Sequence, residues 1–399
     1  MTYLKKLDTQ VDKYTKKWAG VPRSATNVVI HSKEGMDIPT ISEIYTLAHN
    51  SSHTRTRLQG DMVVNLVLDH TLAREAQYSR MHCTTTEAER VYKETLILKT
   101  PDGEIPNFIG DKAKEEERKF IEEMKKAVKV STKQAAQARL QDHAKGLQLQ
   151  GHFLTLASQE KSDVLWKSTM FQLKSGTLKF MMNASIDTLP TPANLARWKY
   201  TSSNKCKLCG NKGTTNHILN CCKVMLDSAR YTWRHNNIVH FIVTNVDSRF
   251  KVYSDLPGWE AAGGGTIPPA LCVTNLKPDI VIMDEHKKTL HIFELTMPLN
   301  RNIDDRNKEK TMKYTPFLTD ITGYNCTLNC FEISSTGFIN TRNKTTLNII
   351  HKFIKKSITK STFMENLNSL AWYGSYKVWL NREDPGFATP PFLVPHLGL

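Results

Sequence analysis

Four cysteines and one histidine crowd into the segment CKLCGNKGTTNHILNCC, residues 206–222. Two residues separate Cys206 from Cys209, and seven separate Cys209 from His217. A tight C-x2-C turn lets two thiolates hold one ion, and a histidine followed about one helical turn later by a cysteine completes a tetrahedron. The spacing therefore predicts a closed, structural zinc site. Chance clustering of buried thiols is the alternative.

The fourth ligand of this site has two candidates. Cys221 follows His217 after three intervening residues, and Cys222 follows it after four. We predict Cys222, because the longer spacing completes the helical turn more comfortably, and we keep Cys221 as the alternative.

The chain has 399 residues and an excess of fifteen positive charges. Such a charge favours a polyanionic partner, which can be DNA, RNA or an anionic membrane surface, because each neutralised phosphate releases condensed counterions. No run of apolar residues approaches the roughly 18 to 20 that span a membrane. We therefore expect an intracellular protein that binds nucleic acid, with an unremarkable basic surface as the alternative. The predicted contact residues lie near the N-terminus and around the cysteine cluster: Lys13, Lys16, Lys17, Arg23, Lys205, Lys207 and Lys212.

Helical patterns dominate the first half of the chain. In the opening YLKKLDTQVDKYTKKW, five apolar residues fall on one helical stripe: Leu4, Leu7, Val11, Tyr14 and Trp18. A second helical run is expected over 41–77, so residues 1–100 should form a small helical bundle.

Residues 101–200 are predicted to form a helical linker. Strong helix formers fill 111–150, with acids early and bases late, the order that the helix dipole favours. The apolar stripe there is narrow, so we expect a long, largely exposed connecting helix, with coiled-coil pairing as the less favoured option. Another helical pattern runs over 164–182, and 201–250 should hold the zinc site and a following helix.

Short strands replace this pattern over residues 251–385. The segments DIVIMD, TLHIFEL and CTLNCFEI have strand character, and a charged helical stretch lies between the second and the third. Strand, strand, helix, strand is an α/β arrangement. The expected fold is therefore a helical bundle and linker, a zinc knuckle and a C-terminal α/β domain, followed by an irregular tail over 386–399.

Two acids are placed to form a second metal site. Asp279 opens the first strand, Glu294 ends the second, and the intervening EHKKT predicts a hairpin turn. Carboxylates on adjacent strands can hold Mg2+ or Mn2+, which polarises a phosphoryl oxygen and acidifies water. Sites of this kind usually carry a lysine two residues after the glutamate, but that position is Thr296.

The following helix can supply the missing cation. Lys310 and Lys313 are three residues apart, with Tyr314 four after Lys310, so either ammonium could reach back over the strands. The chemistry needs a cation near the scissile phosphate, whichever element carries it. The residues alone leave an equal alternative, in which Asp279 caps a strand and Glu294 is a rim acid.

Several segments together resemble the C-terminal part of the polyproteins of site-specific non-LTR retrotransposons. SDLPGW, GGGTIPP and KPDIVIMDEHKKTLHIFELTMPLNRNIDDRNKEKTMKY look like their restriction-like endonuclease domain. The cysteine cluster resembles their CCHC knuckle, and DTLPTPANLARW resembles the helical linker that leads into it. LDTQVDKYTKKWAGVPRSATNVVIHSKEGMDIPTISEIY is similar to the thumb that follows the reverse transcriptase palm.

The resemblance implies a PD-(D/E)XK nuclease fold over 251–385. In it Asp279 and Glu294 are the metal-binding acids, and Lys310 and Lys313 are the paired lysines with Tyr314 beside them. It further implies a nuclear endonuclease that nicks target DNA, so that the freed 3′ hydroxyl primes reverse transcription of the element's RNA.

One feature of the family is missing from the sequence. The adjacent acids Asp304 and Asp305 lie in a polar stretch and do not form a polymerase palm motif. We therefore expect a C-terminal fragment, a truncated copy or a derived host protein, which cannot polymerise on its own. A separate reverse transcriptase is a candidate partner. A catalytically inactive nucleic-acid-binding protein is the alternative function.

Overall fold

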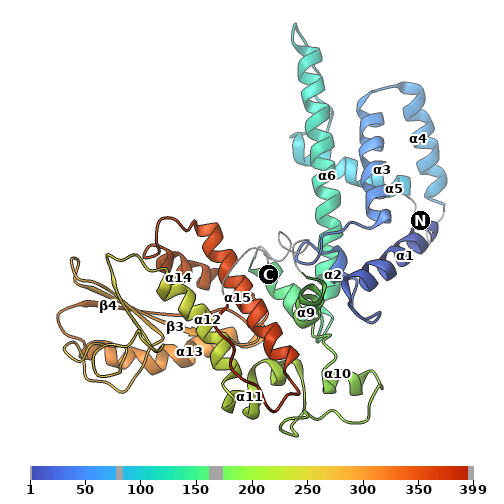
Figure 1. Ribbon diagram of the computed structural model, residues 1–399. Coiled ribbons are helices and arrows are strands. Elements are labelled where there is room, and N and C mark those ends of the chain that lie inside the picture. The colour runs from blue at the N-terminus through green and yellow to red at the C-terminus, as the bar shows by residue number, and fades with distance from the viewer. Residues whose placement is uncertain (1, 78–83, 161–173, 394–399) are drawn as a thin grey trace. The chain divides into compact units, whose positions relative to one another are not determined.

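The computed structural model describes residues 2–77, 84–160 and 174–393. The chain divides into two compact units, which are coloured along the sequence in Figure 1. The first comprises residues 1–15 and 26–146, and the second comprises 16–25 and 147–399. The division after residue 146 falls inside the stretch that we expected to be a linker. None of the described helices combines the length and the apolar character needed to cross a membrane.

The first unit is built from helices. Their bounds are α1 Thr2–Ala19, whose last residues belong to the second unit, α2 Val28–His31, α3 Ile41–Leu58, α4 Met62–Glu75, α5 Thr84–Lys99 and α6 Ala113–Lys145. The single run predicted over 41–77 is in fact two helices. Gly60 adopts a φ of +68°, and the Asp61 side chain accepts a hydrogen bond from the Val64 N–H and so caps α4.

Helix α6 is long and its side chains are largely exposed, as its narrow apolar stripe predicted, but it is not a free connector. It packs against α3 and α5, and Met124 and Val128 are fully buried. The Asn50 amide of α3 donates to Thr132 Oγ1 of α6 at 3.0 Å. Helix α6 is therefore part of the core of the first unit.

The stripe predicted on α1 is also wrong toward its C-terminal end. Val11, Tyr14 and Trp18 are 37%, 64% and 53% exposed. The buried side chains here include Asp12, whose carboxylate lies 2.8 Å from His31 Nε2. A polar contact, rather than the apolar stripe, therefore fixes this part of the helix.

The second unit contains a four-stranded sheet. Its strands are β1 Lys251–Ser254, β2 Ile280–Asp284, β3 Thr289–Thr296 and β4 Asn325–Glu332, in the order β1-β2-β3-β4. The pairs β1–β2 and β2–β3 are antiparallel, and β3–β4 is parallel. A parallel pair needs a crossover, which contains α13, Ile303–Tyr314. The hairpin and the strand, strand, helix, strand order are confirmed, whereas β1 was not predicted.

The sheet has helices on both faces (Figure 1). On one face, Phe293 and Leu295 pack into a core with α12, α14 and α15. On the other, Leu290 and Ile292 pack against Tyr314 of α13 and against the segment after it. Strand alternation places Glu294 on the same face as Ile292, under α13.

The second unit has several further elements. They are α7 Gly151–Gln159, α9 Ser175–Ser185, α10 Pro192–Arg197, η1 His217–Cys221, α11 Lys223–Asp227, α12 Arg230–Thr244, η2 Asn300–Asn302, η3 Thr315–Asp320, α14 Thr341–His351 and α15 Lys360–Leu380. Of the helix predicted over 164–182, residues 164–173 lie outside the described part of the chain. Residues 386–393 form no helix or strand, as predicted for the tail.

Candidate functional site

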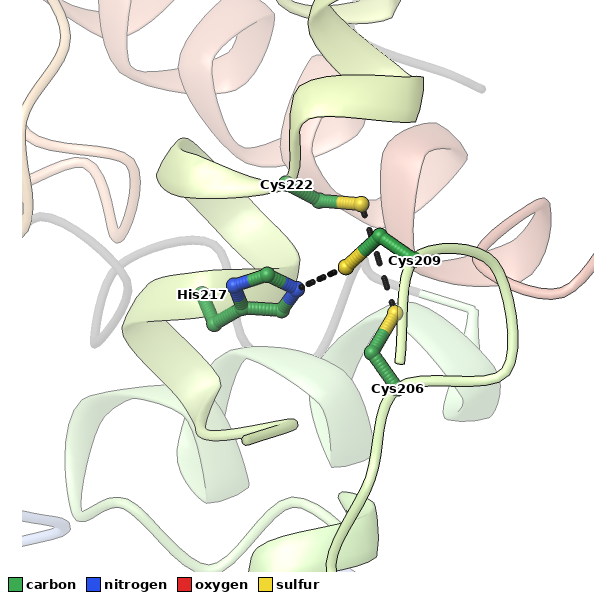
Figure 2. A group of neighbouring side chains, drawn as sticks. All are labelled: Cys206, Cys209, His217 and Cys222. Atoms are coloured by element: carbon green, nitrogen blue, oxygen red, sulfur yellow. Dashed lines mark hydrogen bonds between the residues drawn. The ribbon is translucent and has the colours of Figure 1, made fainter. Parts of the chain in front are cut away.

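The predicted zinc ligands Cys206, Cys209, His217 and Cys222 meet in space (Figure 2). Their ligand atoms all lie within 4.8 Å of one another. The two sulfurs of Cys206 and Cys222 are 4.0 Å apart, and Cys209 Sγ is 3.2 Å from His217 Nε2. Sulfur ligands of a tetrahedral zinc ion, with bonds of about 2.3 Å, lie about 3.8 Å apart. The group therefore fits one zinc ion with little rearrangement.

A π-helical turn selects Cys222 over Cys221. Residues 217–221 form the π-helix η1, and Cys222 follows it directly. In an α-helix, side chains five residues apart would point about 140° away from each other. The wider π turn reduces that angle and brings Cys222 back to the side of His217. Cys221 is exposed, and its sulfur accepts a hydrogen bond from the Asn216 amide at 3.5 Å.

A buried arginine ties this zinc segment to the end of β3. Arg234 of α12 is 2% exposed, and burial lowers its pKa to about 10. Its guanidinium donates to the Leu219 carbonyl oxygen at 2.8 Å, to Asn220 Oδ1 at 3.1 Å and to the Met297 carbonyl oxygen at 3.4 Å. The position of η1 is therefore coupled to the segment that follows Glu294.

The two predicted acids also meet. The backbone N–H of Asp279 donates to Glu294 Oε2 at 3.1 Å, and the N–H of Leu295 donates to Asp279 Oδ2 at 2.7 Å. Glu294 is 2% exposed, and burial together with the Asp279 carboxylate raises its pKa. Each acid is held by the backbone beside the other, so the hairpin itself fixes their separation.

Lys310, and not Lys313, reaches the acids. Lys310 Nζ lies 2.5 Å from Glu294 Oε1, and although burial opposes its charge, Glu294 raises its pKa. Lys313 is exposed, with Nζ 3.4 Å from the hydroxyl of Tyr314. Tyr314 is buried and donates to the Lys277 carbonyl oxygen at 3.3 Å. Helix α13 therefore places one of the two predicted lysines on the site.

Thr296 occupies the position where a lysine is usual. Its Oγ1 is buried and has no hydrogen-bond partner within the part of the chain that the structure describes. The hydroxyl belongs to a residue in the wall of a cavity of about 480 Å3. Asp279 and Lys310 line the same cavity, together with Asn220 and Cys221 from the zinc segment. Glu294 does not line the cavity itself, but Asp279, Leu295 and Lys310 beside it do.

Helix α12 adds a histidine that the sequence patterns missed. His235 Nε2 lies 3.2 Å from Asp279 Oδ2 and 3.2 Å from the Leu295 carbonyl oxygen. Its Nδ1 lies 3.0 Å from Asn236 Oδ1. Burial lowers the pKa of His235, but the Asp279 carboxylate outweighs this and raises it to about 9. The two residues are 44 positions apart, and nothing in their spacing signals the contact.

The oxygen atoms at this site suit a hard divalent cation. Carboxylates and backbone carbonyls are the donors that Mg2+ and Mn2+ prefer, and here Asp279, Glu294 and the Leu295 carbonyl supply them. Positively charged groups contact these oxygens in the structure. His235 contacts the Asp279 carboxylate and the Leu295 carbonyl oxygen, and Lys310 contacts the Glu294 carboxylate. Among the described residues, only the cysteine and histidine group is already close enough to hold a metal as it stands.

The contact of His235 with Asp279 predicts a pH dependence of stability. The pKa of His235 is raised from 6.5 to about 9 in the folded protein, so the contact stabilises the fold fully below about pH 6.5. This stabilisation is lost as the pH rises through about 9. With zinc saturating, the urea midpoint of the second unit should therefore fall more between pH 6.5 and 9.5 in the wild type than in His235→Gln. An equal fall in both proteins would contradict the contact.

The basic residues predicted to contact nucleic acid have different surroundings. Lys16 is 9% exposed, and its ammonium donates to the carbonyl oxygens of Arg23 and Ala25 at 3.2 and 2.5 Å. It anchors the turn after α1, so the phosphate contact predicted for it is wrong. Lys207 lies 2.6 Å from Glu383 in an exposed ion pair. The other predicted residues have exposed side chains: Lys13, Lys17, Arg23, Lys205 and Lys212.

Residues 152–228 match a protein family, zf-RVT, described as zinc-binding in reverse transcriptase. The matched stretch contains all four residues of the group in Figure 2. No curated protein matches the chain. Over residues 152–228, the chain therefore carries a zinc-binding domain of reverse-transcriptase-related proteins, with a Cys3His group consistent with zinc.

Proposed function

We propose that the second unit is a divalent-metal-dependent DNA endonuclease with a PD-(D/E)XK fold. The observation that carries the proposal is the meeting of Asp279, Glu294 and Lys310 beside one cavity, from three different elements. A strand-end acid and a rim acid would not need to share backbone hydrogen bonds and a half-buried lysine. The reverse-transcriptase-related zinc domain supports a role in handling nucleic acid.

The side chains would divide the work of phosphodiester hydrolysis. Asp279, Glu294 and the Leu295 carbonyl would hold Mg2+ or Mn2+, which supplies Lewis acidity toward the phosphate and acidifies water. Lys310 would release Glu294 and place its ammonium against the charge that develops on the phosphate. The buried Thr296 hydroxyl, which lacks a partner among the described residues, could bind an ordered water.

The partners follow from this chemistry and from the resemblance to non-LTR retrotransposon proteins. Target DNA is the substrate, and a nick in it would supply a 3′ hydroxyl for reverse transcription of an element RNA by a separate reverse transcriptase. Such a protein acts in the nucleus. Exposed Lys205 and Lys212 beside the zinc group would contact the phosphate backbone.

Metal removal tests the proposed activity. We expect the zinc-loaded protein to convert supercoiled plasmid to nicked circles with Mn2+ or Mg2+, and to leave it supercoiled when those ions are withheld. Adding excess Ca2+ alone serves as the control for nonspecific effects of a divalent ion. Nicking that persists without Mg2+ or Mn2+ would refute a metal-dependent site.

A second candidate is a protein that binds nucleic acid without cutting it. The excess of fifteen positive charges favours it, as does the ammonium of Lys310 on Glu294, which neutralises a prospective metal ligand. Retardation of DNA or RNA in a gel, weakening steeply with salt, together with no nicking in either metal, would select this candidate over the nuclease.

A further inference from the structure

We propose that His235 is a ligand of the divalent ion, in addition to Asp279 and Glu294. The inference rests on the proposed nuclease site. It adds to that site a residue from α12, whereas the other side chains come from the β2–β3 hairpin and from α13. It also predicts which ion the site prefers.

The distances around His235 Nε2 suit a coordination sphere. In an octahedral site with bonds of about 2.1 Å, neighbouring ligand atoms lie about 3.0 Å apart. His235 Nε2 is 3.2 Å from Asp279 Oδ2 and 3.2 Å from the Leu295 carbonyl oxygen. Once Nε2 has released its proton to solvent, an ion placed on the shared side of these three atoms could therefore bind all of them.

The other ring nitrogen has the partner that a ligating histidine needs. A histidine bound to a metal through one nitrogen usually donates the N–H of the other to an oxygen, which fixes the ring orientation. His235 Nδ1 lies 3.0 Å from Asn236 Oδ1, so the Asn236 amide can play this part. The histidine also sits on α12, a helix whose neighbouring residues Trp233 and Arg234 are buried, so its backbone is held in place.

A nitrogen donor changes the metal preference of the site. Carboxylates and carbonyls suit Mg2+, whereas an imidazole is a softer donor that favours transition-metal ions. A site made of Asp279, Glu294, Leu295 O and His235 should therefore prefer Mn2+ to Mg2+. A competing role for His235 is that of a positive group that blocks the oxygens until the metal displaces it. The two roles predict opposite changes in metal affinity when His235 is replaced.

The test is a Mn2+ titration of the zinc-loaded full chain, with free Mn2+ followed by electron paramagnetic resonance and Mg2+ added as competitor. His235→Gln keeps an amide N–H for Asp279 and removes the imidazole. We expect it to weaken Mn2+ binding at least about tenfold and to narrow the preference for Mn2+ over Mg2+. His286→Ala, in the exposed turn of the β2–β3 hairpin, is the matched control and should bind as the wild type does.

A second measurement needs no substitution. Pulsed electron paramagnetic resonance of one equivalent of Mn2+ in the wild type should show the coupling of a directly bound imidazole nitrogen. Absence of that coupling, or Mn2+ binding that is unchanged or tighter in His235→Gln, would overturn the inference. The Asp279→Asn variant distinguishes a failure of this inference from a failure of the proposed nuclease site. If Asp279→Asn binds Mn2+ as the wild type does, the proposed nuclease site is wrong, independent of the result for His235→Gln.

Discussion

The Cys222→Ser variant should fail to bind zinc, and the segment around η1 should unfold. The Cys221→Ser variant should keep its zinc and its folded η1. Only Cys222 joins the group of ligand atoms, while Cys221 is exposed and outside it. Structural zinc contributes roughly 10 to 16 kcal/mol to the folding of small zinc domains at neutral pH, so loss of one thiolate is a large effect. Inductively coupled plasma mass spectrometry would measure the zinc content of each variant, and thermal unfolding would measure its loss of stability.

The loss should extend beyond the zinc group itself. Arg234 binds both η1 and the Met297 carbonyl that follows β3, so a loosened η1 also loosens one wall of the cavity. We therefore expect Cys222→Ser to weaken any nicking activity as well. Retention of zinc by Cys222→Ser together with its loss from Cys221→Ser would reverse our assignment of the fourth ligand.

Glu294→Gln and Asp279→Asn should each reduce nicking of plasmid DNA about 10³-fold, which corresponds to about 4 kcal/mol of transition-state stabilisation. Both substitutions keep the size of the side chain and remove the negative charge that holds the ion. Loss of the ammonium in Lys310→Ala should cost about 10²- to 10³-fold, the usual range for a group that stabilises developing charge.

Lys308 provides the matched control for the lysine. It lies on the same helix α13 two residues before Lys310, and its side chain is exposed. Lys308→Ala should therefore nick DNA at close to the wild-type rate. If Lys308→Ala and Lys310→Ala lost activity equally, general basicity of α13, and not a positioned ammonium, would explain the effect.

The parts of the molecule that the sequence predicts well are those in which neighbouring residues decide the geometry. The zinc ligands lie within seventeen residues, so chain length alone keeps them near one ion. The β2–β3 hairpin follows from alternating side chains and a short turn. Lys310 follows from helical spacing, although the spacing could not separate it from Lys313.

The parts that it predicts poorly depend on contacts between distant segments. The narrow buried stripe of α6 packs against α3 and α5, and the spacing of its apolar residues does not reveal these partners. The sequence predicts a solvated side chain for Lys16, but its ammonium binds backbone carbonyl oxygens of the turn after α1. His235 lies in a helix with an ordinary apolar face, and only the tertiary fold brings it to Asp279.

The most direct test of the central claim is a crystal structure of the zinc-loaded protein soaked with Mn2+, with anomalous scattering recorded at the manganese edge. We expect a peak in the cavity within about 2.2 Å of oxygens from Asp279 and Glu294. Well-ordered acids with no peak between them, or Mn2+ bound only at exposed carboxylates elsewhere, would contradict a catalytic metal at this site.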